Sequence, residues 1–196
     1  MLKTAITRED IMDLKVYANV RKKRRAAMTE KKKSRRLHCG PHATFSFENF
    51  DTMWHQVHEM LFIEKGGPDQ IEDELTAYNP LVPNGSELTA TLMFEIENPV
   101  IRANFLSGLG GIEETIFFDL ENEIVRGIPE EDVDRTNAEG KASSVQFLHF
   151  PFTAAQITKF CDLSVRVGLA IEHDKYSHVA VLPANVREAL GDDFAV

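Results

Sequence analysis

The sequence predicts an α+β fold: a mainly antiparallel sheet packed with short helices, plus an N-terminal basic helical arm. Residues 87–97 alternate between apolar and polar side chains, which is typical of a long strand in an antiparallel sheet with one solvent-facing side. Helical and strand-like patterns follow one another irregularly, without the strict alternation of parallel α/β folds. Ten Lys and Arg residues crowd into residues 21–36, and this charge marks off the arm.

The charge distribution divides the chain into two parts. Residues 1–40 hold 13 Lys and Arg residues and 4 Asp and Glu residues, a net charge of +9. The whole chain carries −9, so the remaining 156 residues carry −18. A chain of 196 residues can bury one substantial core. We therefore expect a basic helical arm over residues 1–40 and a single α+β domain over residues 41–196.

The first half of the chain is predicted to be mainly helical. Thr7 and Asp10 have the spacing of a capping box, so a helix is expected from about residue 8 to residue 34, before the stop at Gly40. A short strand is expected at residues 44–47. A helical hairpin follows. Its first helix carries the apolar stripe from residue 50 to residue 61, and its second begins at Pro68 and reaches residue 78.

The second half is predicted to be richer in strands. In the strand at residues 87–97, the side chains expected to be buried are Leu88, Ala90, Leu92, Phe94 and Ile96. The elements expected after it are a helix at 99–107, a hairpin of 115–119 with 123–126, a mobile acidic loop at 129–141, a strand at 143–150, a helix at 153–160, a hairpin of 165–171 with 178–182, and a last helix at 183–190.

Composition points to the cytoplasm. The two cysteines, Cys39 and Cys161, are far apart and form no Cys-x-x-Cys pair, which favours a reducing compartment. No apolar stretch approaches the ~20 residues of a membrane helix, so no membrane association is expected. The first residues contain acids where a signal peptide would be apolar.

A divalent metal is the one cofactor that the residues suggest. His55, His58 and Glu59 are three and four positions apart on a predicted helix, so their side chains lie on neighbouring positions of its surface. An acid from elsewhere, such as Glu64 or Glu95, could complete the site. The alternative is that the three residues form the polar edge of an amphipathic helix, because the His-Glu-x-x-His pattern of zinc peptidases is absent.

Three further histidine clusters are open to more than one interpretation. Cys39 stands between His38 and His42 and could bind a soft metal, act as a reactive thiol whose pKa neighbouring arginines lower, or be an inert buried thiol. The segment 173–178 gathers His, Asp and Tyr at a predicted turn, where binding residues often occur, although turn chemistry alone also explains it. His149 lies in a predicted strand and is expected to be a half-buried structural histidine.

The arm is the strongest candidate for an interaction surface. The residues assigned to partner binding are Arg21, Lys22, Arg24, Arg25, Lys32, Arg35 and Arg36, with Gln56 from the next helix. Such a run binds an acidic surface or a polyanion. Nucleic acid is the less favoured partner, because no aromatic residue interrupts the run to stack on bases and the acidic remainder repels phosphates. Since adjacent like charges oppose an isolated helix, the arm should dock on its own domain, on a second copy or on another protein.

Several segments resemble one known family. They read GPHATFSFEN, QVHEMLFIE, AYNPLVPNGSELTATLMFEI, GIEETIFF, FPFT and VGLAIEHDKYSHVAVL, and they are similar to the DUF3501 family of bacterial and archaeal proteins, to which no function is assigned. The resemblance implies a genomic context beside a rubrerythrin-like protein and an iron–sulfur oxidoreductase related to heterodisulfide reductase subunits. It suggests a role in redox metabolism or peroxide defence.

The leading hypothesis is therefore a non-enzymatic accessory protein that docks on such a redox partner through the arm and the polar faces around Gln56 and Glu59. The first alternative is a metal-dependent enzyme or metal carrier that uses His55, His58 and Glu59. The second is nucleic-acid binding through the arm. The residues alone leave open whether the protein is an enzyme.

Overall fold

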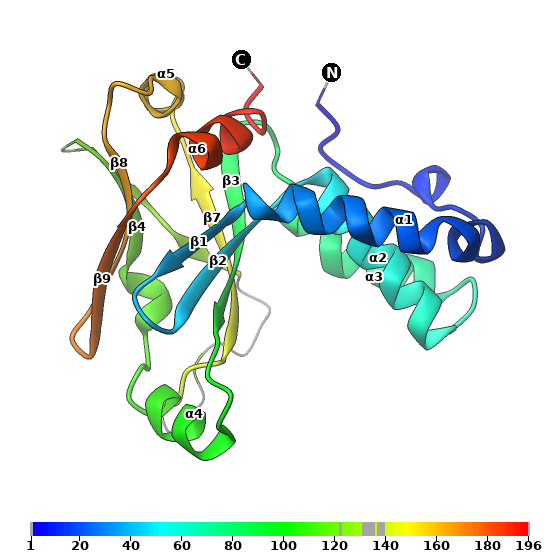
Figure 1. Ribbon diagram of the computed structural model, residues 1–196, viewed down its shortest axis with the longest axis horizontal. Helices are drawn as coiled ribbons and strands as arrows, with labels where there is room; N and C mark the ends of the chain where they lie inside the picture. The colour runs from blue at the N-terminus through cyan, green and yellow to red at the C-terminus, as the bar shows by residue number, and fades with distance from the viewer. Residues whose placement is uncertain (1, 122, 131–135, 137–139, 196) are drawn as a thin grey trace.

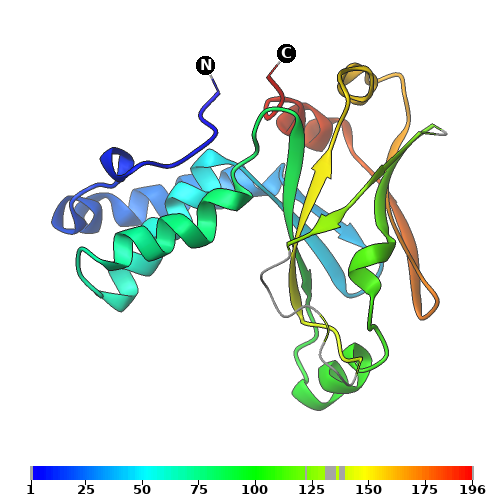
Figure 2. The same ribbon diagram turned by 180° about the vertical axis from the view of Figure 1, so that it is seen from behind.

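Two antiparallel sheets and a group of three helices make up most of the molecule, which confirms the predicted α+β class. The computed structural model describes residues 2–121, 123–130, 136 and 140–195. The sheets face each other, and the three helices lie side by side and extend away from them on one side (Figure 1, Figure 2).

Each sheet is antiparallel throughout its described strands. The five-stranded sheet consists, in spatial order, of β1 (Arg36–Cys39), β2 (Ala43–Glu48), β3 (Glu87–Phe94), β7 (Val145–Pro151) and β6 (Ile128–Pro129). The four-stranded sheet consists of β5 (Ile124–Arg126), β4 (Ile116–Leu120), β8 (Val167–His173) and β9 (Tyr176–Val181). The predicted hairpins of β4 with β5 and of β8 with β9 are both present.

The main hydrophobic core lies between the two sheets. Alternate residues of each strand point inward, so that Phe47 of β2 meets Phe118 of β4 with ring centroids 5.9 Å apart. Phe150 of β7 lies 4.8 Å from the same Phe118 ring in an edge-on contact. Leu92 of β3 is fully buried in this core. The large aromatic rings thus fix the spacing between the sheets.

A second hydrophobic cluster holds the helical unit together, which comprises α1 (Leu14–Lys33), α2 (Phe50–Glu64) and α3 (Gln70–Tyr78). Its buried members include Ile6, Val57 and Leu61. Phe147 of β7 packs against this cluster from the sheet side. The helical unit therefore rests on the outer face of the five-stranded sheet through apolar contacts.

The shorter helices close the ends of the sheets. They are α4 (Pro99–Leu106), α5 (Ala154–Cys161) and α6 (Ala184–Gly191), with 3₁₀ turns at Arg8–Asp10, Asn79–Leu81 and Ile112–Thr115. Asn98 caps α4 and Thr153 caps α5, each through its side-chain oxygen. These caps are visible in the sequence, and both helices were predicted.

The predicted arm differs from the structure at both ends. The helix begins at Leu14 rather than near residue 8, because Asp13 accepts hydrogen bonds from the N–H groups of Lys15 and Val16 at 2.8 and 3.3 Å. The capping box of Thr7 and Asp10 closes a separate 3₁₀ turn. At the other end, β1 lies inside the range assigned to the arm and pairs with β2, and only two of its residues, Leu37 and Cys39, are buried.

The prediction of a solvent-facing side on β3 is wrong. Thr89 is fully buried and donates a hydrogen bond to the backbone oxygen of Leu81 at 2.6 Å, because the helical unit covers this face. The strand ends at Phe94, so Ile96 lies beyond it and is only half-buried. The other four predicted core positions of this strand are buried.

Most of the acidic loop predicted at residues 129–141 lies outside the described residues. Of its described part, Pro129 belongs to the short strand β6, which pairs with β7. Within the described ranges, no helix combines the length and the apolar character that crossing a bilayer requires.

Candidate functional site

The inward side of α1 carries an ion pair with α2. Arg21 holds both carboxylate oxygens of Glu59, its Nε donating to Oε1 and its Nη2 to Oε2, each at 2.8 Å. The guanidinium also lies over the ring of Phe62, 4.5 Å from its centroid. The Glu59 side chain is 14% exposed, so water screens this two-point contact only weakly. The pair fixes α1 against α2.

Tyr17 completes this cluster from the same side of α1. Its ring is fully buried, and its hydroxyl donates to Glu59 Oε1 at 2.8 Å. The hydrogen bond from Arg21 is the main reason that the pKa of Glu59 lies below its ordinary value. Burial, and then the Glu59 carboxylate, raise the pKa of Tyr17. The group therefore consists of a carboxylate that accepts hydrogen bonds from a neutral phenol and from a guanidinium.

His55 and His58 are both buried enough to favour their neutral forms, since burial lowers the pKa of each. His58 accepts a hydrogen bond at Nε2 from the N–H of Met12 at 3.0 Å, and its Nδ1 lies 2.7 Å from the backbone oxygen of Trp54. The proton of His58 therefore resides on Nδ1, and both ring nitrogens have partners. His55 Nδ1 lies 3.3 Å from the Tyr17 hydroxyl.

This geometry does not support the predicted metal site. His58 has no free nitrogen, and Arg21 occupies both oxygens of Glu59. Glu95, one of the acids considered as a completing ligand, accepts a hydrogen bond from Thr44 on the five-stranded sheet. Among the described residues, no group of three or more His, Cys, Asp and Glu side chains is placed to bind a metal ion. The metal site stays a prediction.

The outward side of α1 carries more exposed cations, which differ from Arg21 in their contacts. Within the described part of the chain, Lys22 and Lys23 have no hydrogen bond or ion pair from their ammonium groups, and both are exposed. Arg25 has a 60% exposed side chain, and its Nε lies 3.9 Å from a Glu59 oxygen that Arg21 already binds. Arg24 lies over Trp54, 4.8 Å from the ring centroid. The exposed face of α1 thus presents positive charge without matching carboxylates.

The remaining four residues assigned to partner binding lie in four other places. Arg35 is 3% exposed and pairs with Asp193, so it is part of the protein interior. Arg36 belongs to β1, where its Nε lies 3.5 Å from Ser46 Oγ. Gln56 points towards α3, its amide donating to the Tyr78 hydroxyl at 3.4 Å. Lys32 is half-buried near the end of α1. The structure therefore brings together Arg21, Lys22 and Arg25. It separates from them Arg24, which lies over Trp54, as well as Lys32, Arg35, Arg36 and Gln56.

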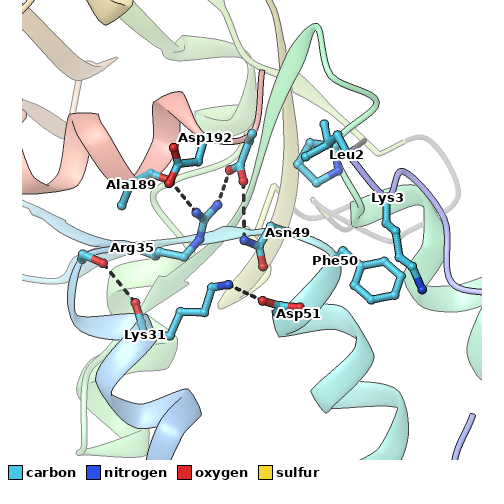
Figure 3. Close-up of a pocket in the computed structure, with 12 residues that line it drawn as sticks. Leu2, Lys3, Lys31, Arg35, Asn49, Phe50, Asp51, Ala189 and Asp192 are labelled. Atoms are coloured by element: carbon cyan, nitrogen blue, oxygen red, sulfur yellow. Dashed lines mark hydrogen bonds and ion pairs between the residues drawn. The ribbon is translucent and has the colours of Figure 1, made fainter. Parts of the chain in front are cut away.

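A cavity of about 650 Å³ lies at the C-terminal end of α1, bordered by the start of α2 and the segment after α6 (Figure 3). Each cation on its wall has an acidic partner. Lys31 pairs with Asp51, and Lys3 pairs with Asp10 at 2.5 Å. The buried ion pair at its base joins the end of α1 to the C-terminal segment, and Asn49 adds a 3.5 Å contact to Asp193. The cations of the wall are therefore balanced within the protein, while the exposed Asp192 adds a negative charge to it.

Cys39 is an inert buried thiol, and the reactive alternative is wrong. Its Sγ faces the backbone oxygens of Leu169 and His178 at 3.7 and 3.4 Å, and burial raises its pKa to about 11. The flanking histidines point elsewhere: His38 contacts Thr44, and the His42 ring packs on Phe105. The three side chains therefore do not converge on a common ligand.

The sequence interpretation missed two members of the α1 and α2 cluster, Tyr17 and Phe62. Tyr17 stands four positions before Arg21, so both lie on one side of α1. In the sequence, an aromatic residue four positions before Arg21 was the available signal that this side of α1 faces the protein. Phe62 follows Glu59 by three positions on α2 and carried no comparable signal.

Comparison with known proteins agrees with this fold. The family described as "Protein of unknown function (DUF3501)" matches residues 5–194. The chain belongs to the DUF3501 family. A crystal structure of a protein from Burkholderia pseudomallei K96243, described as a novel protein of unknown function, is 36% identical in sequence and superimposes with a TM-score of 0.88. The alignment covers 97% of this chain and 99% of that chain. No curated protein matches the sequence.

Proposed function

We propose that this DUF3501 protein is a non-enzymatic accessory protein that docks on an acidic surface of a partner protein through the outward face of α1. The proposal rests on how the cations with and without acidic partners are distributed around this helix. Arg21 on the inward side is matched by Glu59, whereas Lys22 and Lys23 on the outward side have no acidic partner within the described residues. Unmatched charge on one helix face raises the rate and specificity of association with an oppositely charged surface.

The shape of this face supports a protein partner. A groove of about 400 Å³ runs between α1 and Phe62 of α2. It is lined by the small residues Ala18, Ala26 and Thr29 and by three of the cations, Arg21, Lys22 and Arg25. A partner segment that combines an apolar side chain with nearby acids fits such a groove. Apolar anchors in pockets supply most of the affinity of protein interfaces, while rim charges steer the encounter.

The choice of partner follows from the family resemblance. The first partners to test are a rubrerythrin-like protein and an iron–sulfur oxidoreductase from the same cell. Docking on either of them would take place in the cytoplasm. Self-association is a less favoured outcome, because a chain with a net charge of −9 repels a second copy outside the arm. Nucleic acid is also less favoured, since two aromatic rings beside these cations, Trp54 and Phe62, are already covered by Arg24 and Arg21.

The test measures binding of the purified full-length chain to each purified candidate partner. The double variant Lys22→Gln, Lys23→Gln should weaken binding about tenfold or more. Binding by the unmodified chain should also weaken as salt rises, because the Debye length falls from about 10 Å at 0.1 M to about 3 Å at 1 M. Both lysines are exposed, so the variant should melt at the same temperature as the unmodified chain.

The matched control is the double variant Arg126→Gln, Lys175→Gln, which removes the same number of positive charges from exposed positions on the four-stranded sheet. It should bind like the unmodified protein. Equal loss in both variants would show that net charge rather than the α1 face is responsible. Salt-sensitive binding of DNA or RNA by the same face, or a dimer that the lysine variant dissociates, would replace the proposed partner with nucleic acid or with a second copy.

A further inference from the structure

The strand β9 forms one edge of the four-stranded sheet, and it lies on the side of the molecule away from the helical unit (Figure 1, Figure 2). Ser177, Val179 and Val181 of this strand are exposed. The side chains of the two valines are 61% and 49% exposed. The residues between them face the other way: Tyr176 is buried in the main core, and Ala180 packs against it. This edge therefore presents apolar side chains to solvent.

The backbone of β9 also has groups without partners. The N–H of Leu182 donates to the oxygen of Val167 at 2.9 Å, which fixes the alternation of hydrogen bonds between β9 and β8. In that alternation, Ser177, Val179 and Val181 direct their N–H and C=O groups away from β8. Within the described residues, no other strand or side chain is hydrogen-bonded to these groups. Three N–H and three C=O groups are thus open to another strand.

The other described sheet edges are protected against such pairing. The strands β1, β5 and β6 have four, three and two residues, and they contain Arg36, Arg126 and Pro129 respectively. Short length, charge and proline are the usual means by which proteins prevent a sheet edge from pairing. In contrast, β9 has six residues, and none of them is Asp, Glu, Lys, Arg or Pro. It lacks each of these protections.

We propose that β9 pairs with β9 of a second copy of this chain, in antiparallel orientation, about a two-fold axis beside Val179. In this register Val179 lies opposite the partner subunit's Val179, and Ser177 lies opposite the partner subunit's Val181. All of the outward N–H and C=O groups then form hydrogen bonds across the axis. The two four-stranded sheets become one continuous sheet.

Three features favour a second copy over an unrelated strand. The outward backbone groups are arranged symmetrically about Val179, so the edge is complementary to itself. Because β9 contains no charged residue, pairing it with its copy places no like charges opposite each other. Each copy has a single unprotected edge among its described strands, so the assembly closes after two copies, as most isologous contacts do. The axis also extends the row of Phe117, Ala170 and Val179 across the sheet into the partner.

This contact is independent of the proposed docking of α1, and salt distinguishes the two. A contact between two strand edges is small, so we expect a dissociation constant of roughly 1–100 µM. Each copy carries a net charge of −9, and this repulsion opposes dimer formation at low salt. Rising salt should therefore lower the dissociation constant of the dimer, whereas it should weaken binding through α1. The double variant Lys22→Gln, Lys23→Gln should still dimerise.

Sedimentation velocity of the full-length protein between about 1 and 500 µM tests the proposal. A reducing agent is needed because Cys161 is exposed and could form a disulfide between copies. Val179→Lys places two ammonium groups opposite each other and should raise the dissociation constant about tenfold or more. Val100→Lys on α4 is the matched control, since Val100 is 67% exposed and the change in charge is the same. It should dimerise like the unmodified protein.

A mixture of two variants tests the two-fold axis itself. Val179→Glu, like Val179→Lys, should dimerise poorly alone. An equimolar mixture of both should associate about tenfold more tightly than either variant, because the two-fold axis places the lysine opposite the glutamate. Should a Val179 variant fail to fold, Ser177→Lys and Val181→Glu replace the two variants, because these positions lie opposite each other in the same register.

A protein that remains monomeric at about 500 µM would refute the proposal. Equal dimerisation of the Val179→Lys and Val100→Lys variants would refute it as well, because the contact would then lie elsewhere. Folded variants that do not recover association when mixed would exclude this register. A dimer that the Lys22→Gln, Lys23→Gln variant dissociates would belong to α1 and not to β9.

Discussion

His149 is the clearest titrating residue in the structure. Its Nδ1 lies 3.1 Å from Glu87 Oε2, and its Nε2 lies 2.8 Å from Glu130 Oε1. Its hydrogen bond with Glu87, and then that with Glu130, raise its pKa above the ordinary value. Since both partners accept, the doubly protonated imidazolium satisfies both contacts at once. The expected structural histidine thus links β7 to β3 and to the end of β6.

The stability of the protein should therefore decrease as the pH rises through the folded-state pKa of His149. This pKa is higher than the unfolded value of about 6.5, so the contribution is complete below that value and disappears above the folded-state pKa. The measurement is the urea midpoint at several pH values between about 6 and 9. His149→Gln should flatten this part of the profile. The same slope in both proteins would contradict the assignment.

Glu59 provides the test that separates an ion pair from a metal site. Glu59→Gln should lower the free energy of unfolding by roughly 1–3 kcal/mol, because Arg21 and Tyr17 lose a charged acceptor in a mostly buried place. Zn²⁺, Fe²⁺ or Mn²⁺ should leave the melting temperature of the unmodified protein unchanged, since the donors already have partners. Stoichiometric metal that the His55→Ala, His58→Ala double variant loses would restore the metal hypothesis.

At the residue scale, spacing predicted neighbours within one helix but not across helices. His55 and Glu59 lie close together, as the interval of four positions predicts. Their partners Tyr17 and Arg21 come from about forty positions earlier in the chain. No local pattern links these positions. Two of the three residues that suggested a metal site or a polar edge in the sequence, His55 and Glu59, therefore take part in an interhelical contact.

At the scale of elements, α1 is an amphipathic helix held by one aromatic anchor. Tyr17 is fully buried, and its ring contacts Trp54, His58 and Phe62. Tyr17→Ala should therefore reduce the free energy of unfolding by roughly 3–5 kcal/mol, as for other large buried aromatic residues. Chemical denaturation measures this. Val16→Ala is the control, because Val16 is 49% exposed on the outward side, and it should change stability by less than about 0.5 kcal/mol.

Elements with capping residues were the most predictable. Asn49, Asn98 and Thr153 each cap a helix that the sequence predicted. The strands β1 and β6 were missed because two to four residues carry too little alternation. The burial of Thr89 was missed for another reason. A polar residue becomes buried when an element distant in the sequence covers it. The alternation of residues within the strand does not depend on that element and so cannot predict it.

At the scale of the whole molecule, a buried ion pair connects the start of the chain to its last helix. Arg35 follows α1 and Asp193 follows α6; their side chains are 3% and 4% exposed. Burial raises the pKa of Asp193, although the Arg35 charge acts in the opposite direction. Arg35 also donates to backbone oxygens of β2 and α6. This pair joins the helical unit, the five-stranded sheet and the C-terminal segment.

Substituting one member of this pair should lower the free energy of unfolding far more than substituting both. Arg35→Met leaves Asp193 buried without a counter-charge and should cost roughly 3–5 kcal/mol of stability. The double variant Arg35→Met, Asp193→Leu should recover much of that loss. Lys31→Met, at the more exposed pair with Asp51, should cost under about 1 kcal/mol. Additive effects of the two substitutions in a denaturation series would contradict the pairing.

The class of fold was predictable from the sequence, but the order of the strands was not. The sequence predicted the hairpins of β4 with β5 and of β8 with β9, but it missed the third pair of consecutive strands, β1 with β2, because β1 lies in the range assigned to the arm. The central strand β3 lies between β2 and β7, and its register with β7 joins Leu88 to Phe150. Such pairings depend on how side chains pack in the two hydrophobic cores rather than on any local sequence pattern.

The pair of Arg35 and Asp193 has a consequence for synthesis. The two residues are 158 positions apart, and translation adds about 5–20 residues each second. The guanidinium therefore leaves the ribosome many seconds before its counter-charge exists. During that interval the end of α1 has no stable place against the sheet, although α1 and α2 can already associate through Tyr17. We expect the nascent protein to hold a loosely attached helical hairpin until the residues after α6 emerge.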